Sequence, residues 1–193
     1  MKRKLWFVVP ALLASSTAMA HGGHDHVHGL IAGLAHPFGG VDHLVAMVGV
    51  GLLAGILSGA ARWQLPLAFV AAMALGAVAG LVGIGNGAPI EQAIALGVLT
   101  LGLAVAFAAR LRPALATVLV AACAIFHGHA HGAELPSQAD ALTYIAGFAA
   151  STALLHLAGL GLALLLHTRR VAASAVRVAG GAIALAGLVM VVV

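Results

Sequence analysis

The chain has 193 residues, of which 63% are hydrophobic and only 7% are charged, and its formal net charge is +4 with neutral histidines. Its mean hydropathy of +1.13 exceeds what a water-soluble domain needs, so the composition predicts one polytopic membrane domain. The basic residues are scattered and form no patch interleaved with aromatic residues, which argues against a nucleic-acid partner. The single cysteine, Cys123, excludes an intrachain disulfide and argues against a thiolate metal site.

Residues 1–20 have the pattern of a signal peptide. A start with three basic residues precedes an apolar run over residues 5–13 and a small-residue cleavage site at residues 18–20. The alternative is an uncleaved first transmembrane helix, but Pro10 interrupts the run, which is also short for a span of about 20 residues. Cleavage leaves a mature chain that begins at His21, with a formal net charge of +4 − 3 = +1.

Residues 21–28, HGGHDHVH, are too polar to bury and predict a histidine-rich periplasmic tail. Either this tail has no role, or its imidazoles raise the local concentration of a metal ion, since neutral imidazole binds nickel, copper, zinc and cobalt alike. The candidate low-affinity ligands are His21, His24, His26 and His28.

Residues 29–193 predict an all-α transport domain of six transmembrane spans. Glycines at four-residue spacing predict close approach of helix backbones in a compact bundle. The clearest examples are Gly51, Gly55 and Gly59 in one segment and Gly76 and Gly80 in the next. The six segments lie at about residues 29–59, 65–84, 90–109, 113–130, 140–166 and 171–193.

The distribution of charge predicts the orientation of these spans. Every arginine of the mature chain lies in or beside alternate links, which the positive-inside rule assigns to the cytoplasm. These residues are Arg62, Arg110, Arg112, Arg169, Arg170 and Arg177. The other links contain only acidic charges: Glu91, Glu134 and Asp140. With a cleaved signal peptide, both mature termini are then expected in the periplasm, and the protein in a bacterial inner membrane.

Ionisable side chains interrupt the first apolar segment at residues 36–43, HPFGGVDH. Such groups cost about 2.5 to 3.5 kcal/mol each at membrane depth, which makes them functional candidates. His36, Asp42 and His43 offer nitrogen and carboxylate oxygen together, a ligand set that suits Ni²⁺, Co²⁺ or Zn²⁺. The alternative for Asp42 is that its carboxylate caps backbone amides at the start of a helix.

The same motif contains residues that break helices. Pro37 is the expected breaker, and Gly39 and Gly40 are expected flexible or close-approach positions. A broken helix within a bilayer is tolerated where it is buried in protein or lines a cavity, and in transporters such breaks form ion sites. The first span is therefore predicted as a short half-helix, a break, and a full helix from Asp42 onward.

A second histidine cluster lies at residues 126–134, FHGHAHGAE, at the outer end of the fourth predicted span. If the helix continues, His127 and His131 share a face and offer a two-nitrogen chelate. His129 is a further candidate ligand, and Glu134 is a candidate to orient a histidine. The alternative is a polar, solvated helix end.

Two further ionisable residues are candidates for the same pathway. His156 lies alone in the fifth predicted span, where the alternative is a hydrogen bond to Ser151 or Thr152 of its own helix. Glu91 begins the third predicted span, where the helix N-terminus alone would stabilise its charge.

These motifs resemble the HupE/UreJ family of nickel/cobalt permeases. The resemblance rests on HPFGGVDHLVAM (36–47) and FHGHAHGAE (126–134), with weaker agreement around residues 89–91 and 153–156. It implies import of Ni²⁺, sometimes Co²⁺, across the inner membrane to supply hydrogenase or urease. It also implies a site at His36, Asp42 and His43, with His127 and His131 as further candidates.

No nucleotide-binding loop occurs in the sequence, so we expect a facilitator or secondary transporter without an ATPase subunit. The expected partners are the transported ion and the lipid bilayer, and a homo-oligomer is possible from the sequence. We expect no prosthetic group and no enzymatic activity. Three alternatives remain. They are a membrane metal-dependent hydrolase with Asp42 or Glu134 as general base, a haem protein with His36 and His156 as axial ligands, and a metal-binding sensor or scaffold.

Overall fold

The computed structural model describes residues 28–85, 88–107, 111–135, 141–167 and 172–192. These ranges form helices joined by short links and contain no strand. The predicted signal peptide and the tail residues His21, His24 and His26 lie outside the described residues. The elements in chain order are α1 (His28–Ala35), the 3₁₀ helix η2 (His36–Phe38), α2 (Val41–Leu57), α3 (Ala61–Leu81), α4 (Ala88–Ala106), α5 (Pro113–Ala133), α6 (Ala141–His167) and α7 (Ala172–Val192).

The predicted all-α membrane class agrees with this architecture. Five helices, α3 to α7, are long and apolar enough to cross a membrane. The α1–η2 segment and α2 qualify together as a sixth, with a bend of 81° between Gly29–Phe38 and Val41–Leu57. The helix break predicted at HPFGG is thus present. α1 begins at His28, the last residue assigned to the tail, and α5 runs through the second histidine cluster to Ala133.

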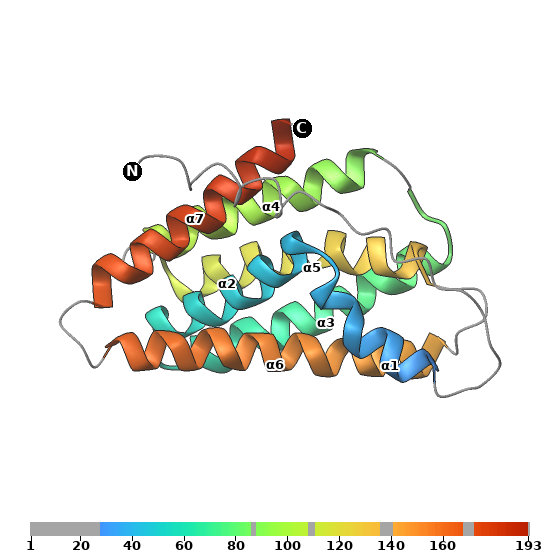
Figure 1. Ribbon diagram of the computed structural model, residues 1–193, viewed down its shortest axis with the longest axis horizontal. Coiled ribbons are helices and arrows are strands. Elements are labelled where there is room, and N and C mark those ends of the chain that lie inside the picture. The colour runs from blue at the N-terminus through green and yellow to red at the C-terminus, as the bar shows by residue number, and fades with distance from the viewer. Residues whose placement is uncertain (1–27, 86–87, 108–110, 136–140, 168–171, 193) are drawn as a thin grey trace, which may run out of the picture.

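The helices pack mainly in pairs. α3 lies against α5, α4 against α7, and α6 against both α2 and α1. Figure 1 shows α4 and α7 together along one side of the bundle and α6 along the other, with α1 beside one end of α6. The core between these pairs includes Met47, Leu53, Phe69 and Val98, all fully buried.

Glycines allow the helix pairs to approach backbone to backbone. A Cβ atom at Gly76 would meet the Ile125 carbonyl, and one at Gly80 would meet the His129 carbonyl. In return, Gly128 lies against the Met73 carbonyl. The close approach predicted at Gly76 and Gly80 is therefore confirmed.

Glycines also allow close contact between α2 and α6. Gly51 faces the His156 carbonyl, and Gly55 faces the Ala163 side chain, so both predicted contacts are confirmed. The prediction for Gly59 is wrong. Gly59 follows α2 in a turn with φ of +55°, and no atom lies within 4 Å of its Cβ position. Its role is conformational, because an L side chain rarely adopts this backbone geometry.

The packing also places the arginines and the histidine cluster at opposite ends of the bundle. The contacts of Gly76 with Ile125 and of Gly80 with His129 make α3 and α5 parallel, so Arg62 in the first turn of α3 and Arg112 before α5 share one end of the bundle. The contact of Gly180 with Ala106 brings the start of α7, which contains Arg177, to the end of α4 that leads into α5. The histidine-rich end of α5 lies at the opposite end.

The α4–α7 contact gives a test of glycine packing away from the histidines. A Cβ atom at Gly102 would collide with the Ala184 backbone, whereas Gly181 on α7 has open space around it. Because overpacking costs about 1–3 kcal/mol, Gly102→Ala should lower the Tm of the detergent-purified protein by several degrees. Gly181→Ala is the matched control and should leave the Tm unchanged or slightly higher. Equal Tm values for the two variants would contradict the packing described here.

Candidate metal centre

The first part of the site is the sharp turn between α1 and α2. Pro37 is buried within η2, and the amide of Gly39 donates to the His36 carbonyl at 2.9 Å, which closes the 3₁₀ turn. Gly40 is extended and precedes α2, where the Leu44 amide donates to its carbonyl at 3.2 Å. Neither glycine has a positive φ, so the turn does not need left-handed flexibility at these positions.

Gly40 is needed for a close approach instead. A Cβ atom at Gly40 would collide with Oδ1 of Asp42 and lie 3.2 Å from Nδ1 of His43. Both side chains therefore fold back over the glycine. Oδ2 of Asp42 lies 2.5 Å from Nδ1 of His43, and these side chains are only 24% and 12% exposed.

Two overlapping groups of ligand atoms form around this turn. The first consists of His36, His43 and His131, and the second of Asp42, His43 and His127. Within each group the ligand atoms lie within 4.8 Å of one another. Since a metal ion lies about 2.0–2.2 Å from nitrogen or oxygen ligands, small side-chain rotations would bring either group around one ion. His43 belongs to both groups, and we call the five residues together the outer cluster.

α5 supplies its two members of the outer cluster from one helical face. His127 and His131 are four residues apart and almost fully buried, with ring centroids 5.4 and 4.4 Å from that of His43. The same-face prediction is confirmed, but the two residues fall into different groups. Gly128 and Gly132, one position further along, lie against α3 and fix which face of α5 turns toward α2.

One hydrogen bond fixes the orientation and the tautomer of the His127 ring. Its Nδ1 lies 2.9 Å from the Cys123 carbonyl of the preceding turn. A carbonyl only accepts, so Nδ1 carries the proton and donates. Nε2 then keeps its lone pair, and it has no hydrogen-bond partner among the described residues. A backbone carbonyl that fixes the histidine tautomer in this way is typical of metal sites.

Glu134 lies at the outer rim of the cluster, just after α5. Its Oε2 is 3.7 Å from Nε2 of His36, and its side chain is 58% exposed. Partial burial raises the pKa of the Glu134 carboxyl above its ordinary value; the Glu91 and Asp42 carboxylates add to this rise, while His43 opposes it. The orienting role of Glu134 stays a prediction, and His36 is the histidine that its carboxylate lies beside.

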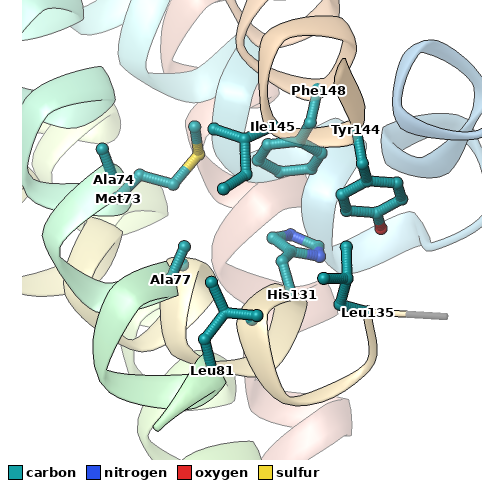
Figure 2. Close-up of a pocket in the computed structure, with 11 residues that line it drawn as sticks. Met73, Ala74, Ala77, Leu81, His131, Leu135, Tyr144, Ile145 and Phe148 are labelled. Atoms are coloured by element: carbon teal, nitrogen blue, oxygen red, sulfur yellow. The ribbon is translucent and has the colours of Figure 1, made fainter. Parts of the chain in front are cut away.

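Aromatic side chains of α6 cover the cluster from the side. The ring centroids of Phe148 and His131 lie 4.0 Å apart, and those of Tyr144 and His36 lie 5.8 Å apart. Figure 2 shows His131 beside a small cavity between α3 and α6, with these two rings above it. Nothing in the sequence distinguishes these two residues, because aromatic side chains in an apolar span are ordinary core residues.

Three candidate ligands lie outside both groups. Nε2 of His129 donates to the Ile84 carbonyl at 2.6 Å, which directs the ring toward the end of α3. Glu91 is exposed in the first turn of α4. His156 lies further along α6, with its ring centroid 5.0 Å from that of Phe69, and it belongs to neither group of ligand atoms that contains His36 or His43.

The fold and the cluster together define a class of protein: a membrane helix bundle whose broken helix presents buried nitrogen and carboxylate ligands. Residues 9–190 match the family model described as HupE / UreJ protein. Protein HupE of Rhizobium leguminosarum bv. viciae is 48% identical over 189 residues, which cover 98% of this chain and 97% of that protein. The chain therefore belongs to the HupE/UreJ family. No solved structure matches it.

The shared position of His43 predicts an order of effects on metal binding. His43→Ala removes a ligand from both groups, whereas His127→Ala removes one ligand from one group. We expect His43→Ala to weaken Ni²⁺ binding at least about tenfold more than His127→Ala. Loss of a residue that only hydrogen-bonds to a metal ligand already costs about 10- to 100-fold in affinity, and His43→Ala removes a candidate ligand from both groups. Calorimetric titration of the purified proteins measures this difference. Equal losses would show that the two groups do not overlap at His43.

Gly40 offers a second test of the same geometry. The methyl group of Gly40→Ala would displace the Asp42 carboxylate from its place beside His43. Ni²⁺ affinity should fall by about tenfold while the Tm stays close to wild type. Gly39→Ala is the control, since its Cβ would meet only the His36 carbonyl at 3.2 Å. Equal affinities for the two variants would count against this placement of Asp42.

Proposed function

We propose that this protein imports Ni²⁺, or the chemically similar Co²⁺, across the bacterial inner membrane to supply metalloenzyme maturation, for hydrogenase or urease. The observation that carries the proposal is the pair of overlapping His/Asp groups at the 81° bend, enclosed by helices long enough to span a membrane. Membership of the HupE/UreJ family, whose members are associated with nickel and cobalt transport, supports the same conclusion.

The ligand chemistry favours a borderline divalent ion. Four imidazoles and one carboxylate form a mixed nitrogen and oxygen set, which suits Ni²⁺, Co²⁺ and Zn²⁺ better than Cu⁺ or Ca²⁺. The Asp42 carboxylate offsets part of the ion's charge where little water is present. Affinity alone does not name the cargo, because Cu²⁺ binds most nitrogen and oxygen sites more tightly than Ni²⁺.

The overlap of the two groups suits passage rather than storage. An ion that leaves the group of His36, His43 and His131 can keep His43 while it gains Asp42 and His127. Conduction requires sites that bind well enough to admit the ion and weakly enough to release it. A ligand shared by two positions lowers the barrier between them.

The orientation follows from charge. The outer cluster lies at the end of the bundle opposite Arg62, Arg112 and Arg177, and the positive-inside rule assigns the arginine end to the cytoplasm. The cluster then faces the periplasm, from which the ion enters. We propose that the α1–η2 segment and α2 count as one broken span, which makes six.

A hydrolase with a side-chain nucleophile has no supporting observation in the described part of the chain. The Cys123 thiol is buried against the Gly97 carbonyl, and the Ser151 hydroxyl donates to carbonyls of its own helix. A metal-dependent hydrolase with Asp42 or Glu134 as general base would use the same outer cluster. We propose a transporter without enzymatic activity because the family is associated with transport.

Uptake of radiolabelled Ni²⁺ into cells tests the proposal. Cells expressing the chain should accumulate Ni²⁺ above the empty-vector level, and His36→Ala, Asp42→Asn and His43→Ala should return uptake to that level. Western blots of the membrane fraction establish equal insertion of all variants. Background uptake by the wild-type chain, or full uptake by the three variants, would overturn the proposed function.

A further inference from the structure

Among the described residues, His156 is the most deeply buried ionisable residue outside the outer cluster. It lies near the middle of α6, two helical turns beyond Phe148, or about 12 Å at 1.5 Å per residue. Its side chain is 1% exposed, and neither ring nitrogen has a hydrogen-bond partner among the described residues. A buried polar group without a partner is rare in proteins and calls for an explanation.

The local hydrogen bonds considered as the alternative for His156 are not formed. The Ser151 hydroxyl donates to the Gly147 and Phe148 carbonyls at 3.2 and 3.0 Å. The Thr152 hydroxyl points to Sδ of Met73 at 4.0 Å. The alternative that Ser151 or Thr152 satisfies His156 is therefore wrong, and the imidazole keeps a free lone pair.

A single aromatic ring connects His156 with the outer cluster. Phe69 of α3 is fully buried and lies edge to face against His156, with ring centroids 5.0 Å apart. Its ring is also 6.0 Å from that of His127. Phe69 thus lies in contact range of one histidine in the outer cluster and of the deeper one.

A small cavity lies between the outer cluster and Met73, which contacts the α6 turn before His156. It has a volume of about 20 Å³, room for about one water-sized group, and His131 and Met73 both line it. Figure 2 shows the His131 ring on one side of this space and the Met73 sulfur on the other. Met73 contacts Thr152, which is one turn before His156 on the same helical face.

We propose that His156 is a second ion-binding position, which the divalent ion occupies after it leaves the outer cluster. This inference rests on the proposed transport function and names the next step of the ion's path. The carboxylates of the described residues, Asp42, Glu91 and Glu134, all lie at the outer end of the bundle. The donors near His156 are a hydroxyl and a thioether, so the ion is held weakly there and moves on.

The test compares His156→Leu, which keeps an apolar volume, with His156→Cys, which replaces the imidazole by a thiolate donor. Ser151→Ala is the matched control, since it is the neighbouring buried polar position on α6. Initial rates of Ni²⁺ and Cd²⁺ uptake are measured in cells over a range of concentrations. Rates are normalised to the amount of monodisperse protein extracted from the membrane, and Ni²⁺ binding is titrated on each purified protein.

We expect His156→Leu to lower the maximal Ni²⁺ uptake rate by about tenfold or more, while Ni²⁺ affinity, set by the outer cluster, stays within about twofold of wild type. Ser151→Ala should transport like the wild type. His156→Cys should recover uptake and raise the ratio of Cd²⁺ to Ni²⁺ uptake by roughly tenfold, because a thiolate favours the softer ion.

Two outcomes would overturn the inference while the proposed function stands. One is wild-type Ni²⁺ uptake by His156→Leu. The other is recovery by His156→Cys with an unchanged ratio of Cd²⁺ to Ni²⁺, which would show that the side chain only packs. If the His156→Leu protein does not accumulate in the membrane, the ratio of Cd²⁺ to Ni²⁺ uptake by His156→Cys tests the inference by itself. Absence of Ni²⁺ uptake by the wild-type chain would instead remove the proposed function itself, and this inference with it.

Discussion

The contact between the Asp42 carboxylate and the His43 imidazole is the interaction on which the site depends. The two groups lie 2.5 Å apart within an apolar bundle, where a buried polar group without a partner costs about 1–3 kcal/mol. His43 belongs to both groups of ligand atoms, so this contact fixes the residue that joins them. The contact in turn requires the bend at HPFGG and the missing side chain at Gly40.

The glycine contacts between helices serve the same end. α3 presses against Gly128 and Gly132, which leaves His127 and His131 of α5 facing the turn before α2. On α6, Gly147 and Gly159 hold the helix against α1 and α2. The histidines are thus positioned by contacts between helix backbones, and these contacts change little when one side chain is replaced. A site on rigid helices keeps its geometry while single ligands exchange around a passing ion.

Much of this arrangement could be predicted from the sequence. Long apolar segments predict helices because the bilayer leaves the backbone few other ways to satisfy its hydrogen bonds, and the HPFGG break follows from Pro37. Four-residue spacing places His127 and His131 on one face. It cannot say what that face meets, so the place of His43 in both groups of candidate ligand atoms could be found only from the structure. Close approach at Gly40 was among the expectations, but not that the side chains of Asp42 and His43 are what approaches it. Phe69 and Tyr144 were missed because nothing distinguishes them from ordinary core residues.

Entry of Ni²⁺ into sealed liposomes that contain only the purified protein would show whether this chain alone transports the ion. A trapped fluorescent chelator reports the ion, no nucleotide is present, and liposomes with the His43→Ala variant serve as the control. We expect the wild-type protein to admit Ni²⁺ down its gradient or in response to an inside-negative potential, and the variant to admit none. Equal entry in both preparations, or none in either, would contradict transport through the outer cluster.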